Sequence, residues 1–182
     1  EIIEKTQRII KEITGKEPVG FRTPSGDWHV RTPYILSEMG FSYSSSMRGD
    51  DKPYYTVLDG EESDLVEIPS KWELDDYVAQ AYSVYPAEPS GLDRISCYRN
   101  VQDNDIREFR GYYDMGLCIS FLMHPQISGA PGRNLVLEEV LKEVTSHEDV
   151  WVATGSEIAE YWKKAYPRKS RTNDENVERW EV

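Results

Sequence analysis

Apolar residues recur along the chain at the 3.6-residue spacing of amphipathic helices, in segments separated by turn-forming residues. In the first segment isoleucines line one face, and Gly15 follows at the point where a left-handed residue would end a helix. The second segment has Thr32 as its expected N-cap and Gly40 at its end. Thr154 and Glu157 are spaced as a capping box before the last segment. The pattern predicts helices at residues 2–13, 33–39, 106–113, 135–144 and 158–165.

Short apolar runs lie between these helices and predict strands. The run at residues 117–123 is almost continuously apolar, which is typical of a parallel strand covered on both faces. Strands and helices therefore alternate through most of the chain, and this order favours an α/β fold with a mainly parallel sheet or barrel. The expected strands lie at residues 19–21, 41–43, 65–68, 117–123 and 150–153.

Three polar stretches show neither the apolar spacing of a helix nor the apolar run of a strand. Residues 48–63 surround a Pro-Tyr-Tyr run with Asp, Gly and Lys, and they predict a loop or an irregular hairpin. Residues 79–90 contain two prolines and predict a long surface excursion. Because 182 residues suit one domain, we expect a single domain over residues 1–168, followed by a polar tail at 169–182.

Composition excludes some classes of partner. The 33 acidic and 21 basic side chains give a formal charge of −12, and such a surface repels nucleic-acid phosphates and anionic lipid. No run of 18 apolar residues is present, so we expect no membrane-spanning helix and no membrane partner. Cys97 and Cys118 are too few for a disulfide framework and are expected as free thiols. The location in the cell stays open, with the cytoplasm slightly favoured.

Active residues of α/β folds gather in the loops after parallel strands, because the scaffold stays packed while those loops vary. That rule selects four places in this chain. They are Arg22 after the first strand, residues 44–47 after the second, residues 72–76 after the third and His124 after the fourth.

The residues at these places resemble a known family. Gly-Phe-Arg-Thr-Pro-Ser-Gly at 20–26 is followed by Leu-Ser-Glu-Met-Gly-Phe-Ser-Tyr at 36–43 and by Ser-Phe-Leu-Met-His-Pro at 120–125. In order and spacing these runs are similar to the polysaccharide deacetylases, the metal-dependent enzymes of carbohydrate esterase family four. The stretch Val-Glu-Ile-Pro-Ser-Lys-Trp-Glu-Leu-Asp-Asp at 66–76 resembles the branch with peptidoglycan-deacetylase-like and allantoinase-like members. The resemblance extends from about residue 1 to about residue 168.

The resemblance implies a fold and a reaction. The fold is an irregular, distorted (β/α) barrel with fewer strands than the usual eight, and this chain would form its C-terminal portion. The reaction hydrolyses a non-peptide C–N amide bond, such as that of an N-acetyl group. It uses a metal-activated water, a base to activate that water and an acid to protonate the leaving amine.

The resemblance also implies catalytic roles. His124 matches the general acid, and Asp75 or Asp76 matches the carboxylate that fixes the tautomer of that histidine and raises its pKa. Arg22 matches the arginine that orients the catalytic aspartate through a bidentate contact. The alternatives are a structural histidine, a pair of helix-capping aspartates and a surface arginine.

Four further residues are expected to contact the substrate. Pro24 and Ser25 belong to the loop motif that follows Arg22. Trp72 is a candidate aromatic wall for a sugar or a flat amide. Trp28 either lines the same pocket or packs under a loop.

Two motifs of the family are absent from this sequence: Thr-Phe-Asp-Asp-Gly, which supplies the base and one metal ligand, and His-x-x-x-His, which supplies two more. The only histidines are His29, His124 and His147, and no two of them are four residues apart. We therefore expect the C-terminal three-fifths or so of a deacetylase, inactive by itself and without metal ligands of its own. A complementing N-terminal segment or chain would supply the Asp and His residues that bind the divalent metal, which we expect to be zinc.

Two classes of function follow. The first is an enzyme that deacetylates an N-acetylated amino sugar or polysaccharide of peptidoglycan or chitin type, or a metal-free relative that opens a small cyclic amide as allantoinase does. The second is an inactive relative that serves as a carbohydrate-binding or interaction module. The expected partners are a carbohydrate or small amide substrate and further copies of the chain in a homo-oligomer.

Overall fold

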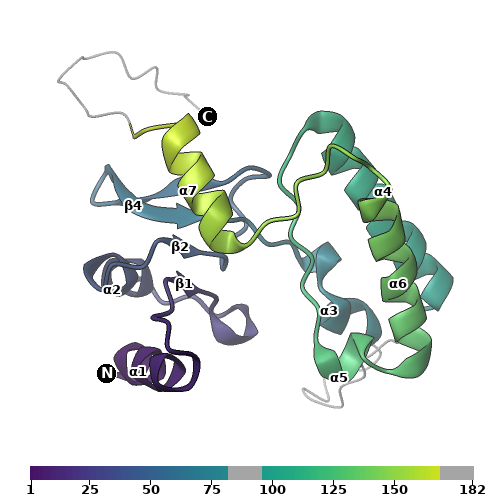
Figure 1. Cartoon of the computed structure of the whole chain (residues 1–182), viewed down its shortest axis with the longest axis horizontal. Helices are drawn as coiled ribbons and strands as arrows, with labels where there is room; N and C mark the ends of the chain where they lie inside the picture. Colours follow the sequence, from purple (N-terminus) through teal and green to yellow (C-terminus); the bar gives the residue numbers. More distant parts are fainter. Residues whose placement is uncertain (82–95, 169–182) are drawn as a thin grey trace.

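The computed structural model describes residues 1–81 and 96–168. A four-stranded sheet occupies one side of the molecule and a group of helices the other, with extended segments between them (Figure 1). The strands are β1 (Gly20–Phe21), β2 (Tyr43–Ser44), β3 (Tyr54–Leu58) and β4 (Glu61–Glu67). The helices are α1 (Ile2–Thr14), α2 (Thr32–Glu38), α3 (Asp76–Gln80), α4 (Tyr98–Met115), α5 (Pro125–Ser128), α6 (Pro131–Thr145) and α7 (Gly155–Ala165), with short 3₁₀ turns η1 (Pro24–Gly26) and η2 (Trp72–Leu74).

The sheet has the order β1-β2-β4-β3. Strands β1, β2 and β4 are parallel, and their last residues Phe21, Ser44 and Glu67 are in register across the sheet. Strand β3 is antiparallel to β4, so residues 48–63 contain the expected irregular hairpin, with a register shift inside β3. Because the parallel strands end together, the loops that follow them begin side by side.

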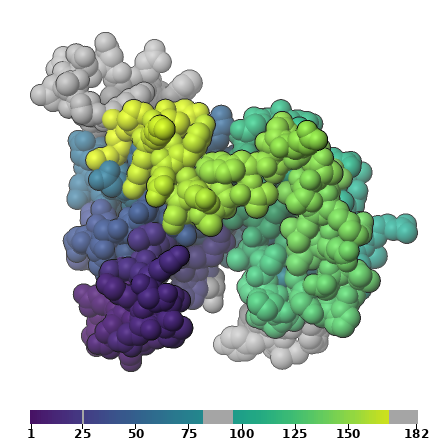
Figure 2. Space-filling model, in the orientation of Figure 1, coloured from purple at the N-terminus to yellow at the C-terminus, as the bar shows by residue number. Residues whose placement is uncertain are grey.

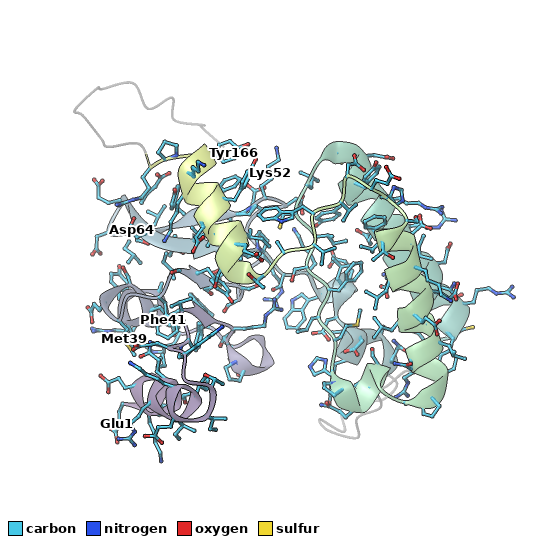
Figure 3. All side chains as sticks on the ribbon, in the orientation of Figure 1. Glu1, Met39, Phe41, Lys52, Asp64 and Tyr166 are labelled. Carbon is cyan, nitrogen blue, oxygen red and sulfur yellow. The ribbon has the colours of Figure 1, made fainter. Side chains whose placement is uncertain are left out.

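Helices cover both faces of the sheet. Neighbouring residues of β4 point to opposite faces, so each of the two faces can pack against a different helix. Leu65 packs with Leu36 of α2 and with Phe41 in one buried cluster, and Met39 and Phe41 lie at the end of α2 (Figure 3). Val66 packs with Ala159 of α7 in a second buried cluster on the other face. The two adjacent apolar residues Leu65 and Val66 of β4 are thus buried on opposite faces of the sheet.

The helix boundaries follow the sequence signals with one correction. Gly15 ends α1 with φ 72°, and the reciprocal capping box of Thr154 and Glu157 begins α7. Thr32 was expected as an N-cap, but it lies inside the first turn of α2 after Arg31, and no side chain caps this helix. The turn before α2 is closed instead by the Thr32 N–H, which donates to the His29 carbonyl at 2.8 Å.

Two expected strands are wrong. Residues 117–123 form no ladder with the described residues beyond one isolated parallel bridge between Leu122 and Asp75. Residues 150–153 make no ladder either, and Trp151 and Val152 are exposed. An apolar run becomes a strand only where another strand lies alongside to take its hydrogen bonds, and the described residues offer none. The described residues consequently show an α/β fold, but no closed barrel.

The remaining helices pack mainly on one another. Helices α4 and α6 are in contact, and α5 leads directly into α6. In the part of the chain that the structure describes, no helix combines the length and apolarity needed to cross a membrane. The expected excursion at 79–90 lies mostly outside the described residues, as does the tail at 169–182.

Candidate functional site

The candidate site begins at the carboxyl ends of the three parallel strands. Arg22 follows β1, residues 45–48 follow β2, and the segment from Ile68 to Asp76 follows β4. Backbone hydrogen bonds join these loops: the Ser45 N–H donates to the Phe21 carbonyl at 2.9 Å, and the Ile68 N–H donates to the Ser44 carbonyl at 2.8 Å. The loops are therefore held against one another at one edge of the sheet.

His124 is held by Asp76. The Nδ1 atom of His124 lies 2.6 Å from Oδ1 of Asp76, and the backbone N–H of His124 donates to both carboxylate oxygens at 3.1 and 2.9 Å. Ser128 donates its hydroxyl to Oδ2 of Asp76 at 2.5 Å. The Asp76 carboxylate is almost fully buried, whereas the His124 side chain is 29% exposed. Because Asp76 takes Nδ1, the histidine is left with Nε2 for chemistry.

Local backbone contacts explain this placement. The Leu122 N–H donates to the Leu74 carbonyl at 2.9 Å, and the Asp76 N–H donates to the Leu122 carbonyl at 3.1 Å. Pro125 then begins α5 directly after His124, and this short helix returns Ser128 to the carboxylate. The bridge and the proline together fix His124 beside the start of α3.

Asp75 has a different task. Its side chain accepts the Tyr77 N–H at 2.9 Å and caps α3. Its Oδ1 lies 3.7 Å from Nδ1 of His124, beyond hydrogen-bond distance. The sequence left open which aspartate holds the histidine, and the geometry assigns that contact to Asp76.

Arg22 lies half-buried in the same region. Its Nη2 atom donates to Oγ of Ser45 at 2.6 Å and to Oγ of Ser120 at 3.3 Å. Burial lowers the pKa of the Arg22 guanidinium, while the negative charges of Glu67 and Asp75 act in the opposite direction. Among the described residues no carboxylate lies within ion-pair distance of this side chain, so the expected aspartate partner is not found among them.

Glu67 is a buried carboxylate that the sequence reasoning did not select. It is 1% exposed, and its Oε1 accepts the N–H groups of Ser46 and Met47 at 2.5 and 2.7 Å. Burial raises the pKa of Glu67, and these N–H groups and the Arg22 charge partly offset that rise. A glutamate inside the apolar run of β4 was the signal that could have identified it.

Asp105 of α4 was also missed. It is buried, and among the described residues the side chain of neighbouring Asn104 donates to it at 3.4 Å. Burial, and then the charges of Asp76 and Glu108, raise its pKa to about 6, while the Asn104 contact opposes the rise. A second buried carboxyl thus lies within electrostatic reach of Asp76.

The four expected substrate contacts separate into two groups. Pro24 and Ser25 lie in η1, and a Cβ atom added at Gly26 would come within 2.6 Å of the Trp72 ring, so this turn adjoins Trp72. Trp72 is 46% exposed, and its role as an aromatic wall for the substrate stays a prediction. Trp28 packs on the buried cluster around Leu36, and whether it also contacts the substrate stays a prediction.

A hollow of about 540 Å³ adjoins Arg22. Arg22, Ser45 and Ser120 supply its polar lining, and Phe21 and Ile158 belong to its apolar lining. Figure 2 shows the indentation between the sheet half and the helical half of the molecule. The hollow is large enough for a small ligand or for protein side chains.

Asp75, Asp76 and His124 form a possible metal group, which the sequence analysis did not anticipate. One ligand atom from each lies within 4.8 Å of the others. Both oxygens of Asp76, however, already accept hydrogen bonds from His124 and Ser128. The observed contacts fit an imidazole held by a carboxylate better than a three-ligand metal centre.

Comparisons with known proteins show which proteins this chain is similar to. A family model described as polysaccharide deacetylase matches residues 1–44. Peptidoglycan deacetylase from Helicobacter pylori is 29% identical over 193 aligned residues, which cover 93% of this chain and 65% of that protein. A solved Mycobacterium smegmatis structure described as a polysaccharide deacetylase is 33% identical, with a TM-score of 0.79 over 95% of this chain and 59% of that one. The structure of Puue allantoinase has the same fold at 22% identity, with a TM-score of 0.74 over 91% of this chain and 52% of that one.

Parallel strands with charged groups at their carboxyl ends, and a histidine held by a buried carboxylate, are typical of hydrolases that use acid–base chemistry. The chain is related to the polysaccharide deacetylase family, carbohydrate esterase family four, and the matches cover only part of those relatives. It spans 65% of the length of the Helicobacter pylori relative and 59% of the Mycobacterium smegmatis structure.

Proposed function

We propose that this chain is the C-terminal part of a metal-dependent enzyme that removes acetyl groups from N-acetylated amino sugars in a peptidoglycan-like glycan. One observation carries the proposal: Asp76 holds His124 through Nδ1, while the other ring nitrogen has no partner among the described residues. The likeness to Helicobacter pylori peptidoglycan deacetylase supports the choice of substrate.

His124 would act as the general acid. A buried carboxylate at Nδ1 fixes the orientation of the ring, so that Nε2 is the nitrogen available to carry a transferable proton. That proton would pass to the nitrogen of the departing amine as the C–N bond breaks. Tyr77, whose ring centre is 5.4 Å from that of His124, limits the freedom of the imidazole.

Arg22 would orient the catalytic base. Its guanidinium has hydroxyl partners but no carboxylate partner among the described residues. We infer that an aspartate from an N-terminal segment supplies the missing partner, completes an irregular (β/α) barrel and packs into the hollow beside Arg22. The family is metal-dependent, and we infer that the same segment holds the metal, which activates the attacking water.

Acetate release tests the proposal. Protein expressed from the complete reading frame, with zinc present, is mixed with an N-acetylglucosamine tetrasaccharide, with peptidoglycan glycan strands and, separately, with allantoin. We expect acetate from a glycan and no ring opening of allantoin, and we expect a chelator to abolish the activity. Allantoin cleavage without acetate release would replace the proposal with a cyclic amidohydrolase, and glycan binding without turnover would indicate a carbohydrate-binding relative.

A further inference from the structure

Arg48 lies in the loop after β2 and stacks on Trp72. Its guanidinium carbon is 3.6 Å from the centre of the indole ring. The stacking joins the loop after β2 to the loop after β4, next to the turn at Gly26. Arginine on an indole face is held by cation–π attraction, which fixes the plane of the guanidinium.

Most N–H groups of the Arg48 guanidinium donate no hydrogen bond to the described residues. A guanidinium has five N–H donors, and in the described part of the chain only Nη1 finds an acceptor, the Ser46 carbonyl at 3.3 Å. Its Nε atom is buried and lacks a partner. No carboxylate of the described residues forms an ion pair with Arg48.

A second unpaired cation lies nearby. The positive charge of Arg48 is felt at Arg22, which also has no ion-pair partner among the described residues. Arg22 in turn feels the charge of Asp75, which adjoins the His124 site. Two guanidinium groups without an ion-pair partner among the described residues thus lie within electrostatic reach of each other, in a region that also feels the charges of Glu67 and Asp75.

The backbone before Arg48 and the Trp72 ring beneath it are both held by neighbouring residues. Glu67 binds the N–H groups of Ser46 and Met47, immediately before Arg48. A Cβ atom added at Gly26 would lie 2.6 Å from the Trp72 ring and 3.4 Å from Nη2 of Arg48, so the turn is closely packed against both. A fork held in this way loses little conformational entropy when it binds an anion.

We propose that Arg48, stacked on Trp72, is a subsite for a carboxylate of the glycan, so that the substrate is an acidic N-acetylated aminoglycan. This inference rests on the proposed deacetylase function and specifies its substrate class. A planar guanidinium matches a carboxylate through two parallel hydrogen bonds. The carboxylate could belong to a lactyl ether on a neighbouring sugar or to an attached peptide, and both sources offer the same chemistry.

Binding measurements test the subsite independently of turnover. Calorimetry on protein from the complete reading frame would compare a neutral N-acetylglucosamine tetrasaccharide with a lactyl-bearing glycan tetrasaccharide, without and with its peptide. We expect the acidic glycans to bind at least about tenfold more tightly than the neutral one, with a preference that weakens as salt rises. If only the peptide-bearing glycan gains affinity, the carboxylate belongs to the peptide.

Variants assign the preference to Arg48. R48Q should weaken binding of the acidic glycan by about 10- to 100-fold and leave the neutral glycan within about twofold, because a charged hydrogen bond is lost. R48K should recover part of the preference, because it keeps the charge without the planar fork. R31Q, which removes the same charge from an exposed side chain, should match the wild type.

Two outcomes would overturn the subsite. Equal affinity of the wild type for neutral and acidic glycans would do so even if R48Q failed to fold, and so would an unchanged preference in a folded R48Q. Absence of acetate release together with an Arg48-dependent preference would instead refute the proposed deacetylase activity and leave the subsite standing.

Discussion

Asp75 and Asp76 are neighbours whose side chains are directed to different partners. Asp75 is the residue before α3 and turns its carboxylate to the free N–H groups of that helix. Asp76 is the first residue of α3, and its carboxylate binds His124 and Ser128. One step along the chain therefore separates a helix cap from the group that orients the candidate acid.

Asparagine substitutions separate these two tasks. Asp76→Asn places an amide NH₂ among N–H and O–H donors, so we expect a loss of about 1–3 kcal/mol in the free energy of unfolding. In the complete enzyme kcat should fall by about tenfold or more, because the imidazolium loses its counter-charge. Asp75→Asn should stay within about 0.5 kcal/mol, since asparagine caps helices as well as aspartate does. Urea unfolding and acetate release measure both, and equal effects would contradict the assignment.

Asp105 gives the protein a stability that depends on pH. Its pKa is raised to about 6 in the folded state, so between pH 4 and 6 the unfolded chain loses this proton before the folded protein does. The contribution of Asp105 is therefore complete below about pH 4 and is lost as pH rises through 6, with a total of at most about 3 kcal/mol. Relative to wild type, Asp105→Asn should be more stable at pH 7 than at pH 4. Urea unfolding at the two pH values tests this, and an equal difference at both would contradict it.

Sequence motifs located Arg22, His124 and the aspartate pair, because each has a fixed position after a strand or in a short run. They did not choose between Asp75 and Asp76, because that choice depends on how η2 turns the chain before α3. Arg48 was missed because its significance arises from stacking on Trp72, which is 24 residues away in the chain.

At the scale of elements, the sequence predicted two N-terminal helix caps, and only one of them forms. The Thr154 box forms as expected, while Thr32 leaves its helix uncapped. Thr154→Ala should lower the free energy of unfolding by about 1 kcal/mol, because α7 loses a side-chain acceptor at its N-terminus. Thr32→Ala, the matched control, should change it by less than about 0.5 kcal/mol. Thermal or urea unfolding compares the two, and equal losses would refute the assigned caps.

Residues 117–123 show where prediction from a single chain fails at this scale. The apolar run predicted a strand before His124, but a strand also requires a partner along its length. Leu122 finds one in the short bridge to residues 74–76, and its neighbours are only half-buried. The apolar run at residues 117–123 predicted a segment buried on both faces, but the described residues bury it only in part.

At the scale of the whole molecule, several apolar surfaces lie open. Ile2 and Ile13 of α1 are 82% and 78% exposed, and the hollow beside Arg22 has the apolar residues Phe21 and Ile158 in its lining. These features agree with a chain that spans 59–65% of its relatives' length. The homo-oligomer expected from the sequence stays a prediction.

Supplying an N-terminal segment should therefore change both stability and metal content. We expect the 182-residue chain alone to melt with low cooperativity and to hold no stoichiometric zinc. Protein from the complete reading frame should melt cooperatively and bind about one zinc ion. Differential scanning calorimetry and elemental analysis give the two readouts. Stoichiometric zinc in the short chain, lost in His124→Ala, would place the metal at Asp75, Asp76 and His124 instead.

The kinetics of His124→Ala test the central claim most directly. Protonation of the leaving amine matters in the transition state and contributes little to ground-state binding. Acetate release by the complete, zinc-loaded enzyme should therefore show kcat lowered by about 10²- to 10⁴-fold, with KM changed by less than about threefold. An unchanged kcat, or a loss expressed wholly in KM, would remove His124 from the chemistry and contradict the proposed site.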